Sequence, residues 1–182
     1  MLDSLLQLDG QLLVAIQGLH ISWLDPVVSF YTKLGDAGLL WIVLSLAMLL
    51  YKPTRKAGAL ALGAMILGLL VTNITIKPLV ERARPWLVWP IEPLVTEKDP
   101  NSFPSGHTCA AFAAGMIWLR ALPWRWGRIA AAAAAVCMGL SRLYVGVHYP
   151  TDVLAGAVIG SLCAWVVWKA YQVYEDRRNS VY

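Results

Sequence analysis

The chain has 182 residues, of which 58% are hydrophobic and 14% charged, and its formal net charge is +4. Its mean hydropathy of +0.58 lies above the range of soluble domains of this length, so the composition indicates an integral membrane protein. The charged residues stand at the ends of apolar runs, so we expect a lipid bilayer, and no nucleic acid, as partner. Helices of about 20 residues, each crossing ~30 Å of hydrocarbon, would use most of the chain, which predicts a single membrane-embedded domain over residues 1–182.

Residues 1–34 form the first predicted element. Leucine and isoleucine recur there at helical spacing, while polar residues such as Asp3 and Gln7 fall between them. This pattern favours an amphipathic helix lying in the membrane interface over a transmembrane span. The acidic start lacks the basic segment of a secretory signal, so we expect no cleavage. Residues 21–34 are expected to form a short second helix against the bundle.

Five apolar runs follow, and the clearest covers residues 57–76. These positions carry no charge and are rich in small residues, which allow membrane helices to pack closely. The other four runs are shorter or polar at one end: residues 37–51, 104–122, 128–146 and 151–172. The sequence therefore predicts an all-α membrane bundle over residues 36–172 with five transmembrane helices. A sixth span within residues 1–34 is the alternative.

The connections between these runs differ in charge, which predicts their orientation. Basic residues gather in three regions: Lys52, Arg55 and Lys56; Arg120, Arg125 and Arg128; and Arg177 and Arg178. Positive charge favours the cytoplasmic side, and two predicted spans separate each region from the next. The remaining segments, residues 78–103 and 141–152, then face outward together with the N-terminal stretch. The unusual polar residues of the chain lie in these outward segments.

The first outward segment is KPLVERARP, at the end of the clearest span. It places the cations Lys77, Arg82 and Arg84 close together, against the single acid Glu81. Read alone, such a cluster is typical of basic side chains that extend to lipid headgroups. A phosphate-binding site is the second interpretation.

The second segment is NSFPSGHTCAAFAAG, in which Ser105 is predicted to cap a helix that carries Gly106 and His107. A helix N-terminus directs free backbone N–H groups and the positive end of the helix dipole toward the outer face, which favours anion binding. An ordinary capped helix with an interfacial histidine is the alternative.

The third segment, SRLYVGVHYPTD, contains Arg142, His148 and Asp152. If the next helix begins near residue 149, the histidine and the aspartate lie close enough to hydrogen-bond, although such a pair can also be purely structural. Taken together, the three segments put two histidines, an acid, several cations and a helix N-terminus at one membrane face. Ionisable residues near membrane depth favour a functional site.

This combination fits one task, which is to hold a phosphate and break a bond to it. The residues expected to bind phosphate oxygens are Lys77, Arg84, Ser105, Gly106 and Arg142. His148 is expected to attack phosphorus while Asp152 binds its other ring nitrogen. His107 is then the expected proton donor to the leaving group, and the base for hydrolysis of the phosphohistidine.

These motifs resemble the type 2 phosphatidic acid phosphatase family, integral-membrane lipid phosphatases that share a helical core with vanadium haloperoxidases. The motifs stand in the family's order: Lys77 with Arg84-Pro85, Pro104-Ser105-Gly106-His107, and Ser141-Arg142 with His148 and Asp152. The resemblance covers about residues 36–172. It implies a haloperoxidase-like core, the residue roles given above, and a reaction with no metal and no cofactor.

In compact bacterial members of this family the expected substrate is undecaprenyl diphosphate, whose hydrolysis recycles the lipid carrier of cell-wall synthesis. Phosphatidylglycerophosphate, phosphatidic acid and lipid A phosphates are alternatives, and a non-catalytic lipid-phosphate-binding protein is a more remote one. The predicted spans argue against a soluble haloperoxidase. Arg82 and Lys98 in the outer loop are candidate contacts for a second phosphate. We therefore expect a phosphatase of the bacterial cell membrane with an outward-facing site, and no oligomeric state is predicted.

Overall fold

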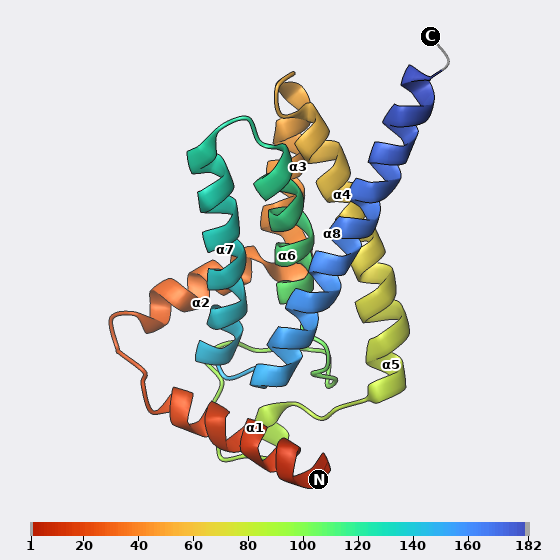
Figure 1. Cartoon of the computed structure of the whole chain (residues 1–182). Helices are drawn as coiled ribbons and strands as arrows, with labels where there is room; N and C mark the ends of the chain where they lie inside the picture. The colour runs from red at the N-terminus through yellow and green to blue at the C-terminus, as the bar shows by residue number, and fades with distance from the viewer. Residues whose placement is uncertain (1, 181–182) are drawn as a thin grey trace.

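The computed structural model describes residues 2–180, which form an all-α structure (Figure 1). Its helices in chain order are α1 (Leu2–Gln17), α2 (Asp25–Leu34), α3 (Leu39–Leu50), α4 (Arg55–Leu69), α5 (Lys77–Val80), α6 (Gly106–Ala121), α7 (Arg125–Tyr144) and α8 (Pro150–Asn179). A π-helical turn, Leu70–Ile76, continues α4 directly into the short α5. Short 3₁₀ turns, Asp36–Gly38 and Pro85–Leu87, precede α3 and follow α5.

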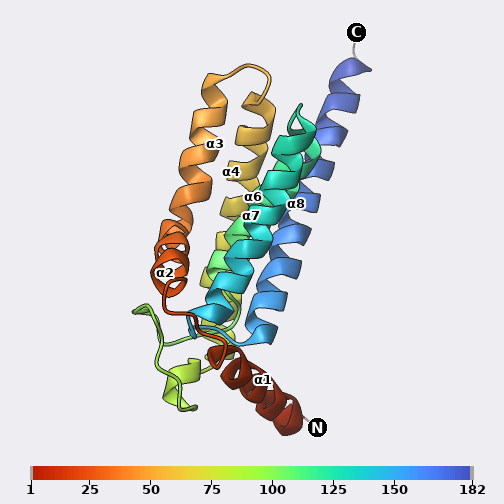
Figure 2. The same ribbon diagram turned by 90° about the vertical axis from the view of Figure 1, so that its left-hand side faces the viewer.

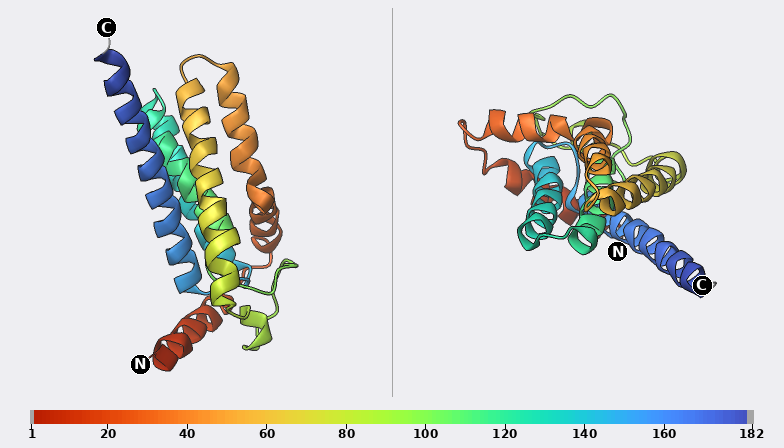
Figure 3. Two further views of the ribbon diagram at one scale, coloured as in Figure 1. Left: turned by 90° about the vertical axis from the view of Figure 1, so that its right-hand side faces the viewer. Right: turned by 90° about the horizontal axis from the view of Figure 1, so that it is seen from above.

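The bundle consists of α3, α4 with α5, α6, α7 and α8, which run side by side (Figure 2). The helix α6 packs against α4, α7 and α8, so it lies at the centre of the bundle. Trp41 of α3, Ile117 of α6 and Met138 of α7 are fully buried in the main apolar core. The helix α1 stands apart from this parallel set and lies across one end of the bundle (Figure 3).

The two ends of the bundle differ in charge. The α3–α4 loop, the α6–α7 loop and the C-terminal end of α8 lie at one end (Figure 1), and they carry the three basic regions of the sequence. The other end holds α1, the long α5–α6 loop and the α7–α8 loop. The structure thus separates the basic connections from the three polar segments, in agreement with the charge pattern.

Two helical stretches are long and apolar enough to cross a membrane, Arg55–Val80 and Pro150–Asn179. A third candidate is the pair Asp25–Leu34 and Asp36–Leu50, which are bent by 50° relative to each other. Within residues 2–180, length and composition qualify these stretches alone, and α6, with 16 residues, is too short to pass by itself. The count of five spans therefore stays a prediction.

The helix predicted near the N-terminus is present as α1, but its two faces are used in an unexpected way. Leu5, Leu8 and Leu12 are exposed, whereas Asp9 is 3% exposed and lies with Leu13 on the side that faces the protein. The apolar stripe is thus available to lipid, and a carboxylate is buried against the bundle. Its place in a membrane interface stays a prediction.

The π-helical turn Leu70–Ile76 interrupts the clearest apolar run. Inside it, Thr72 Oγ1 donates a hydrogen bond of 2.7 Å to the carbonyl oxygen of Gly68, where the α-helical hydrogen-bond ladder widens. Because the turn ends next to Lys77, it sets the direction in which this side chain leaves the helix. Residues 57–76 carry no charge and predict a continuous helix, which the structure interrupts at this turn.

The helices α6 and α8 touch through their backbones. A Cβ atom at Gly156 would lie 2.5 Å from the carbonyl oxygen of Ser105, and one at Gly160 would lie 2.4 Å from that of Cys109. Only glycine leaves room for this approach. The backbone N–H of Ser105 also donates to the carbonyl oxygen of Asp152 at 3.0 Å. The first turns of α6 and α8 are therefore held together.

Replacing Gly156 by alanine should force α6 and α8 apart. We expect Gly156→Ala to lower the thermal unfolding midpoint in detergent micelles, at a cost of about 1–3 kcal/mol, because the new methyl group meets the backbone of α6. Gly63→Ala is the matched control, since a Cβ there meets only Val167 at 3.7 Å and alanine favours a helix. Equal stability of the two variants would show that the helices are not in contact at Gly156.

Candidate active site

The residues predicted to bind and cleave a phosphate lie at the same end of the bundle as α1. They are Lys77 at the start of α5, Arg84 in the loop after it, Ser105, Gly106 and His107 around the first turn of α6, Arg142 in the last turn of α7, His148 just before α8, and Asp152 in the first turn of α8. Apart from Gly106 and His107, each of them is buried. The fold therefore gathers side chains from five parts of the sequence into one protected region.

His148 is 1% exposed and contacts two of the predicted partners. Its Nε2 is 3.1 Å from Arg84 Nη1, and its Nδ1 is 3.4 Å from Asp152 Oδ2. A guanidinium only donates hydrogen bonds, so Nε2 must accept, and the proton of the neutral ring is assigned to Nδ1, facing the carboxylate. This tautomer leaves the lone pair of Nε2 directed toward the arginine.

Burial lowers the pKa of His148 well below its usual value, and the positive charges of Arg84 and Arg142 lower it further. His107 and Lys77 act in the same direction, so all four groups lie within electrostatic range of the ring. The imidazole is therefore neutral at neutral pH, which is the state that a nitrogen nucleophile needs.

The guanidiniums of Arg84 and Arg142 share the carboxylate of Glu97. Arg142 Nη2 donates to Glu97 Oε1, and Arg84 Nη2 lies 3.8 Å from Glu97 Oε2. Arg142 Nη1 also donates to Thr32 Oγ1 at 2.7 Å, whereas its Nε is buried and has no hydrogen-bond partner in the described part of the chain. Because an unpaired buried donor is unfavourable, the region around the guanidiniums of Arg84 and Arg142 is suited to an anion with several oxygen atoms.

Lys77 is paired with a second carboxylate of the α5–α6 loop. Its Nζ donates to Asp99 Oδ2 at 2.7 Å, while the backbone N–H of Asn101 donates to Asp99 Oδ1 at 2.9 Å. Burial raises the pKa of Asp99, but these hydrogen bonds and the positive charges of Lys77 and Arg84 together outweigh burial, so the net shift is downward. The carboxylate is therefore ionised and neutralises Lys77.

Glu97 and Asp99 are not among the site residues predicted from the sequence. The signal that identifies them is their position, in the long α5–α6 loop that faces three buried cations. In residues 2–180, no group of three or more histidine, cysteine, aspartate or glutamate side chains is arranged to hold a metal ion.

The start of α6 has the predicted cap. Ser105 Oγ accepts hydrogen bonds from the backbone N–H of Thr108 at 3.4 Å and from its hydroxyl at 2.9 Å. His107 points elsewhere, with Nε2 2.9 Å from Asp36 Oδ1. Gly106 packs against Asn73, whose Oδ1 would lie 3.1 Å from a Cβ at this position. The N-cap is confirmed, and phosphate binding at this helix start stays a prediction.

Arg82 lies in different surroundings from those expected of a second-phosphate contact. Its Nη1 is 2.7 Å from Asp152 Oδ1, and its Nη2 is 2.7 Å from Asp9 Oδ2. Both ends of the guanidinium therefore face carboxylates, and the structure gives no support to a phosphate there. Lys98, the other candidate for this role, is exposed.

An apolar groove of about 660 Å³ opens beside His107. Its walls come from α3, α4 and α6 and include Leu62 and Ile66, while Glu97 and Asp99 line it together with His107. The groove thus joins apolar helix surfaces to the charged groups. Such a shape fits an amphiphile that carries a phosphate at one end of a hydrocarbon chain.

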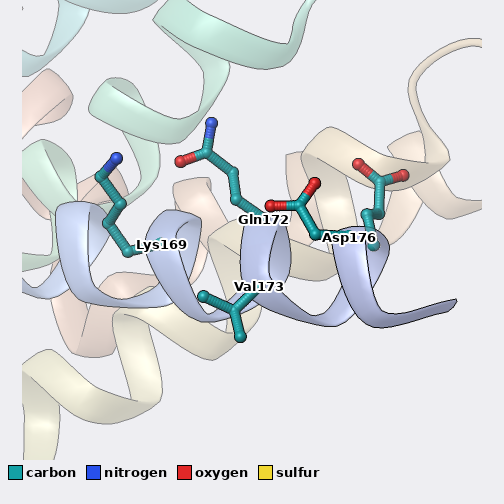
Figure 4. A pocket seen from close by; sticks show the side chains of 5 residues that line it. Lys169, Gln172, Val173 and Asp176 are labelled. Carbon is teal, nitrogen blue, oxygen red and sulfur yellow. The ribbon is translucent and has the colours of Figure 1, made fainter. Parts of the chain in front are cut away.

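Two other hollows lie away from these charged groups. One, of about 680 Å³, is apolar and lies between α2 and α7, beside Tyr31 and Leu140. The other is a shallow pocket near the C-terminal end of α8 (Figure 4), lined by Lys169, Gln172, Val173, Glu175 and Asp176. Because α8 has 30 residues, this second pocket is about 30 Å from the start of the helix, at the basic end of the bundle.

Comparisons with known proteins agree with this architecture. Residues 57–176 match the PAP2 superfamily. An undecaprenyl-diphosphatase of Sulfolobus acidocaldarius is 30% identical over 85% of this chain and 72% of that protein, and a lipid A 4'-phosphatase of Bacteroides thetaiotaomicron is 29% identical over 92% and 79%. The crystal structure of a PAP2-type phosphatidylglycerolphosphate phosphatase from Bacillus subtilis has a TM-score of 0.76 at 30% identity, covering 93% of this chain and 87% of that one.

The bundle, the buried histidine with its cations, and these relatives define a class of helical membrane proteins that remove phosphate from lipids. The chain belongs to the PAP2 superfamily, since the match covers well over half of its length. It is a lipid phosphatase, an enzyme that hydrolyses a lipid phosphate. The family expected from the three sequence motifs is thereby confirmed, while the relatives differ in the lipid that their names give.

Glu97 should compete with anions for the two buried arginines. We expect Glu97→Gln to strengthen inhibition by orthovanadate about tenfold, the effect of roughly 1.4 kcal/mol, because the neutral amide holds the guanidiniums less tightly. The control is Glu92→Gln, an exposed position in the same loop, which should leave the inhibition constant unchanged. Weaker inhibition of Glu97→Gln would mean that Glu97 supports the anion site.

Acid should destabilise the folded protein through His148. An unfolded histidine has a pKa of about 6.5, and burial lowers this value in the folded state. Between the two pKa values the unfolded chain binds more protons, so stability is complete above about pH 6.5 and falls below it by up to ~1.4 kcal/mol per pH unit. The thermal unfolding midpoint in detergent should therefore be lower at about pH 5.5 than at about pH 7.5. In His148→Gln this midpoint should fall less steeply with pH. Identical slopes would exclude His148 as the protonated group.

Proposed function

We propose that the protein hydrolyses undecaprenyl diphosphate to undecaprenyl phosphate at the outer face of a bacterial cell membrane, through a phosphohistidine on His148. The observation that carries this proposal is the buried, neutral imidazole, whose Nε2 faces Arg84. Glu97, which lies next to Arg84, lines the apolar groove, so the nucleophile and the groove belong to one site. The reaction uses only side chains of this chain and water.

Hydrolysis takes two displacements. In the first, His148 Nε2 attacks the terminal phosphorus and the bond from phosphorus to the bridging oxygen breaks. His107 enters this step as the imidazolium, gives its proton to the departing undecaprenyl phosphate and becomes neutral. In the second, His107 takes a proton from water, the oxygen attacks the phosphohistidine, and the bond from phosphorus to nitrogen breaks. Asp152 accepts the Nδ1 hydrogen bond and stabilises the positive charge that develops on the ring.

The positive groups stabilise the phosphoryl oxygens in both steps. We assign this role to Lys77, Arg84 and Arg142, together with Ser105 and Gly106 at the start of α6. In the structure the three cations are paired with carboxylates of the α5–α6 loop. The substrate phosphate replaces these carboxylates when it enters, which keeps the buried positive charges compensated throughout.

The proposed membrane arrangement has five spans: α3, α4 with α5, α6, α7 and α8. Apolar side chains are exposed along α8, among them Leu154, Val158 and Leu162, as lipid contact requires. The basic loops lie at the end of the bundle away from the α7–α8 loop, which carries His148, and this supports an outward-facing site. The exposed leucines of α1 support its place in the outer interface.

The choice of undecaprenyl diphosphate rests on two observations. Three buried cations suit a compact headgroup with more than one negative charge, and the Sulfolobus acidocaldarius relative is an undecaprenyl-diphosphatase. The relatives named for lipid A and phosphatidylglycerolphosphate make these two lipids the alternative substrates. Phosphatidic acid is the third alternative.

The proposal is tested by phosphate release from undecaprenyl diphosphate in detergent micelles that contain EDTA. We expect turnover by the wild type, and a loss of at least about 10³-fold in kcat for His148→Ala, because the nucleophile is removed. His20→Ala is the matched control, since His20 contacts the carbonyl oxygen of Tyr144 at the side of α1 and should be dispensable for turnover. Full turnover of His148→Ala would contradict the assigned nucleophile.

The substrate is decided by kcat/KM on undecaprenyl diphosphate, phosphatidylglycerophosphate, phosphatidic acid and lipid A, measured side by side. The proposal expects the largest value for undecaprenyl diphosphate. A larger kcat/KM for another lipid would make that lipid the assigned substrate and would not contradict the proposed mechanism. An acid-labile phosphoenzyme that is absent from His148→Ala would support the covalent step independently.

A further inference from the structure

Asp9 of α1 is one of the most buried carboxylates of the protein, with 3% of its surface exposed. Its Oδ2 accepts hydrogen bonds from Arg82 Nη2 at 2.7 Å and from the hydroxyl of Thr151, and its Oδ1 accepts the backbone N–H of Thr151 at 3.0 Å. This side chain therefore joins the N-terminal helix to the first turn of α8. The proposed mechanism gives it no role.

Arg82 is held on several sides between α1 and α8. Its Nη1 donates to Asp152 Oδ1 at 2.7 Å and to Thr151 Oγ1 at 2.8 Å, and its guanidinium carbon lies 3.7 Å from the centre of the Tyr149 ring. A planar guanidinium that is stacked and hydrogen-bonded in this way has little freedom to turn toward a substrate. Its contacts instead fix the position of Asp152.

Asp152 completes a continuous path to the nucleophile. One carboxylate oxygen, Oδ1, binds Arg82, and the other, Oδ2, accepts the backbone N–H of Tyr149 at 2.9 Å and lies 3.4 Å from His148 Nδ1. The order of contacts is thus Asp9, Arg82, Asp152 and His148, from the end of the protein inward. Each carboxylate in this path is nearly or completely buried.

We propose that Asp9 and Arg82 are positioning residues for the phosphatase reaction, acting on His148 through Asp152. Arg82 orients the carboxylate, and Asp9 shares the charge of the guanidinium between two anions. Asp152 then keeps net negative charge for the imidazolium that forms on His148, which a neutral Arg82–Asp152 pair would not supply. The inference rests on the proposed function, since it assigns a role toward the proposed nucleophile.

A purely structural role for Asp9 predicts a different outcome from a positioning role. If Asp9 only attaches α1 to the bundle, its replacement lowers stability and leaves turnover of the folded enzyme unchanged. If Asp9 tunes Asp152, its replacement lowers kcat and leaves KM almost unchanged, because no substrate contact is lost. If Arg82 meets a substrate phosphate, freeing it from Asp9 changes KM.

The test compares Asp9→Asn with the wild type in micelles containing undecaprenyl diphosphate. Asparagine keeps an acceptor for the N–H of Thr151 and removes the charge opposite Arg82. We expect kcat to fall about tenfold, the loss typical of one hydrogen bond to a charged group, with KM within about twofold of the wild type. The matched control is Glu81→Gln, which removes an exposed charge next to Arg82 in sequence and should leave both constants unchanged.

The pH profile supplies a second readout. The groups that face His148 are the cations Lys77, Arg84 and Arg142, the second histidine His107, and the carboxylate of Asp152. Removing the negative charge of Asp9 makes these surroundings more positive, so the acid limb of kcat/KM should move to lower pH in Asp9→Asn. If Asp9 had a purely structural role, the acid limb of kcat/KM in Asp9→Asn would stay at the pH of the wild type.

The outcomes separate this inference from the proposed function. A wild type that releases no phosphate from any of the four lipids overturns both. Turnover by the wild type with unchanged kcat and an unchanged acid limb in folded Asp9→Asn overturns the inference alone, as does a change confined to KM. A lower kcat together with a shifted acid limb supports it.

Discussion

Positive charge buried in an apolar helical bundle must be compensated, and this requirement governs the end of the bundle that holds His148. Lys77, Arg84 and Arg142 are each less than about a tenth exposed, and an unpaired charge at such depth costs several kcal/mol. Their ion-pair partners, Glu97 and Asp99, both belong to the α5–α6 loop. The path of that loop over the site is therefore held by these ion pairs as well as by the packing of Ile91 and Val95.

Two neighbouring sets of ion pairs meet this requirement in different ways. Glu97 and Asp99 have 18% and 42% of their side chains exposed and belong to a loop, so they can leave the cations when another anion arrives. The side chains of Asp9 and Asp152 are 3% and 0% exposed and belong to helices, so water and other anions have little access to their ion pairs with Arg82. In the proposed mechanism a phosphate exchanges at the first set, and the second set holds one side of His148 in place.

Features that depend on neighbours in sequence could be predicted, whereas pairings between distant segments could not. The cap at Ser105 and the approach of His148 to Asp152 follow from spacings of a few residues, and both are present. The contact of Asp9 with Arg82 depends on how the first helix folds back over the bundle, which no local pattern encodes. The faces of α1 were hard to assign for a related reason, since leucines of a membrane protein can face lipid as well as the core.

The π-helical turn between α4 and α5 has a consequence for the register of the chain. A wider turn holds one residue more than an α-helical turn, and each residue of an α-helix advances the direction of the side chains by about 100°. Lys77 therefore points about 100° away from where an uninterrupted helix would aim it, toward Asp99 and the other cations. The turn thus shifts the helix register by one residue. The side chains of α4 keep the register that packs them in the bundle, and Lys77 takes the register that directs it to the proposed phosphate site.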